Sequence, residues 1–111
     1  MDIYVEDVAS VTVVSLVGDL DGNTAPRAQA EILPLIGSGA RIVLDMTGLE
    51  FMSSAGARML LLIYRQIRAS DASVILAGLH SEIEDMLGAT GFLDHFEVTG
   101  TVNDGLAMFG A

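Results

Sequence analysis

Two adjacent serines, Ser53 and Ser54, are the side chains best placed for chemistry. They lie between a short β-branched run at residues 41–45 and an apolar helical pattern that continues to about Ala69. A serine where a helix begins is exposed, and its hydroxyl lies beside backbone amides that have no partner within the helix. Such a hydroxyl can cap the helix, attack a substrate or accept a phosphate, and capping alone is the commonest of these roles.

The residues around the serines do not fit a hydrolase. Ser54-Ala55-Gly56 partly matches the G-x-S-x-G turn of hydrolases, but Met52 stands where that turn needs its first glycine. A serine hydrolase also needs a histidine and an acid, which follow in a much longer chain. The sequence contains neither a P-loop nor a GxGxxG phosphate-binding motif. We therefore expect no enzyme activity, no catalytic residue and no cofactor.

Metal binding is not expected either. The sequence has no cysteine, and its two histidines, His80 and His95, lack further ligands at metal-binding spacing. Asp19 and Asp21 share a polar loop, but the remaining oxygen ligands of a calcium loop are missing. We interpret the histidines as ordinary loop residues and the aspartates as a polar rim.

The pattern after the serines gives the helix two different sides. At about 100° per residue, one sector of roughly 60° holds a serine, a leucine and two arginines: Ser54, Arg58, Leu61 and Arg65. The opposite side is mostly apolar and suits the core; it consists of Ala55, Met59, Ile63, Gln66 and Ile67. Leu61 is therefore predicted to be exposed between arginines, which are enriched at interfaces, so this is a candidate docking site. The alternative is a single exposed leucine without a function.

The net charge restricts the choice of partners. Fifteen acidic residues oppose five arginines, there is no lysine, and the formal net charge is −10. This charge repels nucleic-acid phosphates and anionic lipid surfaces, and it favours a partner with a basic face. The longest apolar run, Met59–Tyr64, is far shorter than the roughly 20 residues that span a bilayer, and no secretory signal is evident. We expect a cytoplasmic protein that binds neither nucleic acid nor membrane.

A hairpin is predicted near the N-terminus. Residues 3–5 and 11–17 are β-rich with partial alternation, and polar residues separate them, which is typical of two antiparallel strands. Gly18 is expected to end the second strand, and a polar loop over residues 19–24 leads to the first helix.

The first helix is bounded by residues with known positional preferences. Asn23 or Thr24 is the expected cap, because a short side-chain oxygen there accepts from free amides. Pro26 fits the first turn, and Pro34 should end or kink the helix because proline lacks the backbone donor. The buried stripe of this helix is expected to consist of Ala30, Leu33 and Ile36.

Strands and helices alternate along the rest of the chain. The predicted strands are residues 41–45, 73–78 and, at an edge of the sheet, 96–98. The predicted helices begin at Ser53 or Ser54, at Ser81 and at Asn103 or Asp104, and end near Ala69, at Gly88 or Gly91, and at Phe109. The segment between residue 45 and the serines is expected to be a short loop. This order predicts one α/β domain over residues 1–111, with a four- to five-stranded mixed sheet covered by about four α-helices.

Several stretches together resemble the STAS domain of bacterial anti-sigma factor antagonists. Members of this family have a strand ending in Asp-Leu, then a loop close to F-M-D-S-S/T-G, then a helix. This chain has Asp45-Met46 and Phe51-Met52-Ser53-Ser54-Ala55-Gly56. VVSLVGDLDGNTA at 13–25 is similar to the family's strand, Gly-x-Leu-Asp loop and helix start; SVILAGL at 73–79 and IEDMLGATGFLDHFEV at 83–98 are similar to its later elements. The resemblance covers nearly the whole chain and implies the STAS fold.

The resemblance also implies a regulated serine and a partner-binding surface. The serine that this family phosphorylates falls on Ser54; Ser53 replaces the usual preceding aspartate and is a second, less favoured acceptor. Asp21, in the Gly-x-Leu-Asp loop, falls where family members contact their partner. The expected surface combines this loop with the start and outer side of the helix: Asp21, Asn23, Thr24, Ser53, Ser54, Gly56, Arg58, Leu61 and Arg65.

The function implied by the resemblance is partner switching. The unphosphorylated domain would bind an anti-sigma factor that is also a serine kinase of the GHKL ATPase type, and so release the sigma factor. The kinase would phosphorylate Ser54 with ATP and dissociate, and a PP2C-type phosphatase would restore the first state. The alternative is a STAS module that serves as a structural subunit of a lipid-transport or signalling complex, because the aspartate before Ser54 is missing.

Overall fold

The fold alternates strands and helices along the chain, and the computed structural model describes residues 1–89 and 91–111. The strands are β1 (Asp2–Val8), β2 (Val11–Leu20), β3 (Arg41–Asp45), β4 (Leu49–Met52), β5 (Ser73–Ala77) and β6 (Glu97–Thr99). The α-helices are α1 (Ala25–Ile32), α2 (Ser54–Ser70), α3 (Ser81–Ala89) and α4 (Val102–Met108), with 3₁₀ turns at Leu33–Leu35 and Phe92–His95. The predicted α/β class, with a mixed sheet and four α-helices, is confirmed for the described residues: five strands form the main path of the sheet, and β4 adds a sixth that pairs with β2.

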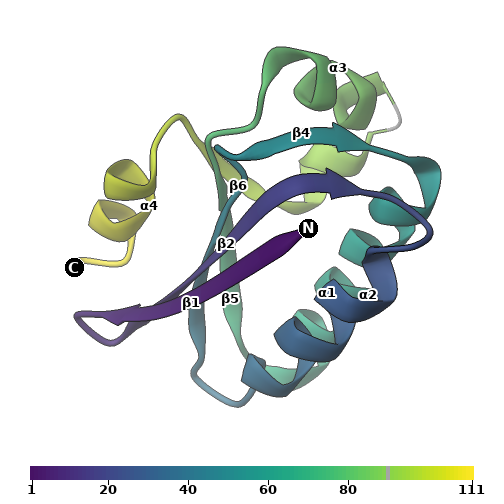
Figure 1. The fold of residues 1–111 in the computed structure, drawn as a ribbon. Helices are drawn as coiled ribbons and strands as arrows, with labels where there is room; N and C mark the ends of the chain where they lie inside the picture. Colours follow the sequence, from purple (N-terminus) through teal and green to yellow (C-terminus); the bar gives the residue numbers. More distant parts are fainter. Residues whose placement is uncertain (90) are drawn as a thin grey trace.

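The strands form one mixed sheet in the order β1-β2-β3-β5-β6, and β4 pairs with β2 outside this path (Figure 1). β1 and β2 are the predicted antiparallel hairpin, with Asp2 opposite Val17 and Val8 opposite Val11. β2, β3, β5 and β6 run parallel to one another. The two predicted central strands and the edge strand are therefore confirmed to within one residue at their ends.

β2 does not end at Gly18, as the sequence predicted, but continues to Leu20. Gly18 has a φ of 111°, and the register shifts between Gly18 and Asp19, where the end of β2 pairs with β4. A glycine with positive φ inside a strand marks a bulge rather than an end. The segment before the serines was expected to be a loop, but its residues Leu49–Met52 form β4, which pairs with the end of β2. Ser53 follows β4 directly.

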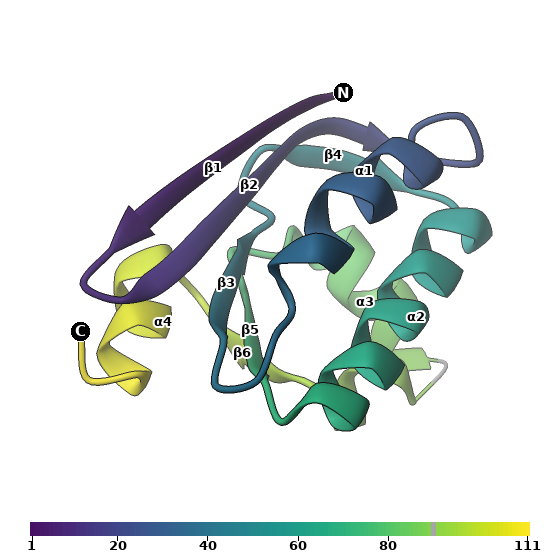
Figure 2. The same ribbon diagram turned by 90° about the horizontal axis from the view of Figure 1, so that it is seen from below.

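Helices cover both faces of the sheet (Figure 2). α1, α2 and α3 contribute to the larger core on one face, whereas α4 packs on the other face. The alternation along β3 shows the division, because Ile42 and Leu44 belong to the larger core and Val43 to the smaller one. The smaller core joins Val11, Val13, Val43 and Ala77 to Val102, Leu106 and Phe109 around α4.

The buried side of α1 differs from the predicted stripe. Its buried residues are Ala25, Ala28 and Ile32. Ala30 is exposed, so that part of the prediction was wrong. Pro34 ends the α-helix as expected, and the 3₁₀ turn around it changes the spacing of the side chains. Consequently Leu33 is only partly buried, while Ile36 is buried after the turn.

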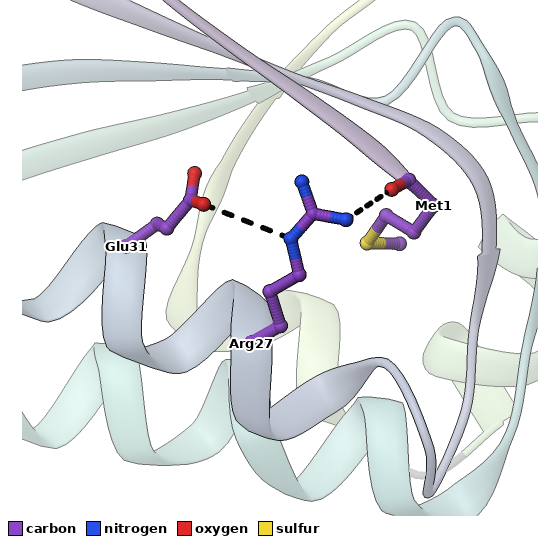
Figure 3. Close-up of polar contacts among 3 residues, drawn as sticks. All are labelled: Met1, Arg27 and Glu31. Atoms are coloured by element: carbon purple, nitrogen blue, oxygen red, sulfur yellow. Dashed lines mark hydrogen bonds and ion pairs between the residues drawn. The ribbon is translucent and has the colours of Figure 1, made fainter.

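The exposed side of α1 holds the beginning of the chain (Figure 3). Arg27 Nη1 donates to the carbonyl oxygen of Met1 at 2.7 Å, and Arg27 Nε lies 3.7 Å from Glu31 Oε1. Because both partners are exposed, we expect the ion pair to contribute little to stability. The hydrogen bond from Arg27 to Met1 instead links the start of β1 to the helix.

One helix boundary also differs from the sequence predictions. α4 is capped by Thr101, whose Oγ1 accepts from Asp104 N at 3.0 Å, rather than by Asn103 or Asp104. α3 covers Ser81–Ala89 and so continues through Gly88, whereas Gly91, the other predicted end, has a left-handed φ of 73° after the helix. Thr90, the threonine of the expected Thr-Gly turn, lies outside the described residues.

Candidate functional site

Ser53 is the N-cap of α2, and its hydroxyl oxygen accepts a hydrogen bond from the helix. Its Oγ accepts a hydrogen bond from Gly56 N at 3.3 Å, and its backbone N donates to Leu20 O at 2.9 Å. The first bond satisfies one of the free amides at the helix start, and the second joins this turn to the end of β2. Ser53 is half-buried as a result. The predicted capping role of this serine pair therefore belongs to Ser53.

Ser54 is the first residue of α2 and is exposed. Within residues 1–89 and 91–111, its hydroxyl has no hydrogen-bond partner. The two serines thus differ in accessibility: the hydroxyl of Ser53 stabilises the fold, and that of Ser54 faces solvent. Of the two, Ser54 is the one that an enzyme or a partner can reach without disturbing the helix cap.

Gly56 lets the first turn of α2 approach the end of β2. A Cβ at this buried position would lie 2.7 Å from Leu20 O and 3.0 Å from Met52 Cγ. Distances this short are not tolerated, so a larger residue would displace the helix start together with both serines. Gly56 is therefore a positioning residue, held by contacts that are remote in sequence.

The β2–α1 loop lies beside this helix start. A Cβ built on Gly22 would be 3.9 Å from Ala55 Cβ, which places the loop in contact distance of the first turn of α2. The structure therefore brings together the loop residues and the serines that the sequence assigned to one surface. Of these, Asn23 is exposed and Thr24 is half-buried.

Asp21 organises this loop. Its Oδ1 accepts from Asn23 N at 2.9 Å and from Thr24 N at 3.1 Å, and these two backbone hydrogen bonds lower the pKa of the carboxyl below its ordinary value. Thr24 occupies the N-cap position of α1, as predicted, but its Oγ1 donates to Asp19 O at 2.8 Å instead of capping the helix. The carboxylate of Asp21 thus stabilises the loop conformation.

The outer side of α2 carries an arginine strip, which we define as Arg58, Leu62 and Arg65. Both arginines are exposed, and within the described part of the chain neither forms an ion pair or a side-chain hydrogen bond. Three of the five arginines belong to α2; the third, Arg68, donates to Tyr64 Oη at 3.2 Å. A local positive strip therefore follows Ser54 in a chain of net charge −10.

The exposed leucine of this strip is not the predicted one. Leu61 is partly buried and packs against the core, whereas Leu62 is 43% exposed. The helical-wheel prediction was wrong here because the partly buried Ala57, Leu61 and Tyr64 all lie on one side of α2, so the covered sector extends to that side. Gln66, assigned to the core side, is exposed, and its Nε2 donates to Ser70 Oγ at 3.2 Å.

The histidines have structural contacts. His80 Nε2 lies 2.6 Å from Thr47 O, and the His95 ring packs on Tyr64 with 4.7 Å between centroids. Among the residues that the structure covers, no three histidine, cysteine or acidic side chains are grouped closely enough to hold a metal ion. Within the same ranges, no helix combines the length and the apolar character that a membrane crossing requires.

The fold and these sequence features agree with known proteins. The STAS domain model matches residues 2–105, and the chain therefore belongs to the STAS domain family. BtrV of Bordetella bronchiseptica, which is named as an anti-sigma factor antagonist, is 27% identical over 110 residues, 98% of this chain and 95% of BtrV. The resemblance that the sequence suggested is confirmed.

Two solved structures show how far the likeness extends. An anti-sigma factor antagonist from Mycobacterium paratuberculosis is 25% identical with a TM-score of 0.77, over 99% of this chain and 94% of that one. The anti-sigma factor antagonist SpoIIAA, in its unphosphorylated form, is 23% identical with a TM-score of 0.80, over 99% and 98% of the two chains. The described residues thus have the STAS fold.

Proposed function

We propose that this chain is a cytoplasmic anti-sigma factor antagonist that acts by partner switching, as a single STAS domain over residues 1–111. Unphosphorylated, it binds an anti-sigma factor that is also a serine kinase of the GHKL ATPase type, and the sigma factor is released. Phosphorylation of Ser54 ends this binding, and a PP2C-type phosphatase reverses it. The observation that carries the proposal is the exposed, unbonded hydroxyl of Ser54 beside a cap whose own hydroxyl is engaged.

The binding surface in this proposal is continuous. It includes the β2–α1 loop with Asp21, Asn23 and Thr24, the first turn of α2 and the arginine strip. Loop contacts of this kind carry specificity on a rigid scaffold. Gly56 acts through position rather than contact because it is buried, and Leu61 supports the helix from its partly buried side.

The phosphate acts locally rather than through the overall field. It adds about −1.5 to −2 charges, which is small beside the net charge of −10, and salt screens it beyond ~8 Å. In the free domain the helix start and its amides favour an anion. In the complex the phosphate must lose its water against the partner. A cost of about 4 kcal/mol there would weaken binding roughly a thousandfold.

Matched serine variants test the switch. Ser54→Ala should bind the anti-sigma factor permanently and accept no phosphate, whereas Ser54→Asp should bind it poorly. Ser53→Ala is the control, because it removes the neighbouring hydroxyl and keeps Ser54. The assay is calorimetric titration with the kinase, followed by phosphopeptide mapping after incubation with ATP. Phosphate found on Ser53 alone contradicts the assignment.

A structural subunit is the second candidate, and the serine in place of the usual aspartate before Ser54 favours it. Such a subunit would keep the fold and bind its complex regardless of the state of Ser54. Incubation with the cognate kinase and ATP separates the two functions, because a subunit remains unmodified and Ser54→Asp leaves its binding unchanged.

A further inference from the structure

A small apolar groove lies between β4 and α3, next to the serines. It has a volume of about 190 Å³ and is lined by Glu50, Phe51, Met52, Glu82, Ile83 and Met86; we call it the β4–α3 groove. Pockets for small-molecule ligands usually measure roughly 300–1,000 Å³. The groove is therefore of a size to receive a side chain of another protein rather than a cofactor.

Phe51 is the main apolar surface of this groove. Its side chain is 53% exposed, although β4 is a strand whose other apolar residues, Leu49 and Met52, are buried. A single exposed aromatic side chain is common on folded domains, but Phe51 lines the groove together with Ile83 and Met86. A contiguous apolar surface with a polar rim is typical of an interaction site. Met86, which is partly buried, adds a flexible apolar wall from α3.

Two carboxylates flank the apolar floor. Glu50 on β4 and Glu82 on α3 are both exposed, and in the described part of the chain neither has an ion-pair partner. The apolar floor and the acidic rim together suit a partner segment that places an apolar side chain next to a Lys or an Arg. A second copy of this chain, with its net charge of −10, is repelled from such a rim.

The groove lies next to the proposed Ser54 surface. Met52, which lines the groove, is the last residue of β4, and Ser53 and Ser54 follow it directly in the chain. A partner that contacts Ser54 at the start of α2 is therefore close enough to reach the groove as well.

We propose that the anti-sigma factor inserts an apolar side chain into the β4–α3 groove and places Lys or Arg beside Glu50 and Glu82. This inference rests on the proposed function for the identity of the partner. It assigns that partner a second contact area which does not depend on the phosphate. Phosphorylation of Ser54 removes one part of the interface, and the groove supplies much of the affinity of the unphosphorylated state.

The aromatic contact is tested with a matched pair of variants in calorimetric titrations of the purified anti-sigma factor. Phe51→Ala should weaken binding about 30-fold, as for a central aromatic anchor. Tyr4→Ala is the control, because Tyr4 is a 59% exposed aromatic of β1, on the other side of β2; it should change the affinity less than about twofold. Equal effects of the two variants would overturn the proposal.

The charged rim has its own matched pair. Glu82→Lys should weaken binding about fivefold and reduce its salt dependence, whereas Glu84→Lys, on the same turn but outside the groove lining, should not. Thermal unfolding of every variant shows whether the fold persists, as expected for exposed positions. If Glu84→Lys weakens binding as much as Glu82→Lys, the rim has no specific role and the proposal fails.

Methionine methyl NMR locates the contact directly. With the anti-sigma factor added, the Met86 methyl should shift, while that of Met108, 53% exposed on α4, should not. No shift of Met86 at saturation overturns the proposal, and a shift that depends on the concentration of this chain alone assigns the groove to a second copy.

Ser54→Asp is measured in the same series to separate this inference from the proposed function. If Ser54→Asp weakens binding but Phe51→Ala does not, the groove assignment fails and the switch stands. If only Phe51→Ala weakens binding, the groove stands and the switch fails.

Discussion

Gly56→Ala tests whether the close approach of α2 to β2 positions the serine. The added methyl would lie 2.7 Å from Leu20 O, a backbone oxygen that also accepts from Ser53 N and cannot rotate away. Overpacking costs roughly 1–3 kcal/mol, and a backbone obstacle places this site in the upper half of that range. Alanine in place of a helical glycine returns up to about 1 kcal/mol. We therefore expect a net loss of about 1–2 kcal/mol.

The assay is thermal unfolding followed by circular dichroism, with the rate of Ser54 phosphorylation as a second readout. For a domain of this size, a loss of about 1–2 kcal/mol lowers Tm by roughly 4–15 °C. The phosphorylation rate should also fall, because the first turn of α2 must shift to make room. Gly22→Ala is the control for stability: its methyl would lie 3.9 Å from Ala55 Cβ, an ordinary contact, so Tm should change little.

A Gly56→Ala variant with an unchanged or raised Tm and a normal phosphorylation rate would refute this reasoning. It would show that the start of α2 is not held by its contact with Leu20, and that another residue positions Ser54.

Three further predictions concern the same surface. Ser53→Ala should lower the free energy of unfolding by about 1 kcal/mol in urea, because Gly56 N loses its acceptor, and phosphorylation at Ser54 should persist. Arg58→Gln should raise the second pKa of phosphorylated Ser54, ordinarily about 6, because a guanidinium one turn away favours the dianion; an unchanged ³¹P titration removes Arg58 from phosphate binding. Asp21 should titrate below 3.8 in a carboxyl ¹³C experiment, since two backbone amides donate to it. Its lowered pKa stabilises the fold above the unfolded-state pKa, and this contribution is lost as the pH falls through the folded value; a midpoint at or above 3.8 contradicts the loop assignment.

Elements with a strong local signal were predictable from the sequence. The β-branched run at Arg41–Asp45 gives a buried strand with the predicted ends, and the proline at position 34 ends α1 where its missing donor requires. The prediction of the apolar side of α2 was largely correct: Met59, Ile63 and Ile67 recur at helical spacing and are buried. These patterns depend on nearby residues only.

The failures depend on contacts that are remote in sequence. β4 was not predicted, because its burial pattern does not alternate as in a typical strand. Glu50 and Phe51 are both exposed and lie between the buried Leu49 and Met52. Only its pairing with β2 makes the segment a strand. The β4–α3 groove is not predictable from the sequence either, because Phe51 belongs to a segment with the pattern of a loop and meets α3 only in the folded chain.

At the site, the sequence predicted which types of residue come together but not the contact that each side chain makes. The sequence identified a pair of serines at a helix start. It did not show that Ser53 Oγ accepts from Gly56 N, or that Ser54 has no side-chain hydrogen bond among residues 1–89 and 91–111. The polar β2–α1 loop was recognised, yet the stabilising role of the Asp21 carboxylate depends on backbone geometry. Leu61 and Leu62 are adjacent, and the neighbours of α2 decide which of them is exposed.

Site-localised mass spectrometry of this protein from its own cells, in free and anti-sigma-factor-bound fractions, tests the central claim most directly. We expect one phosphate, on the tryptic peptide of Ser54 and at that residue, in the free fraction only. Phosphate at Ser54 in the bound fraction, phosphate confined to Ser53, or none in either fraction under any growth condition would contradict it.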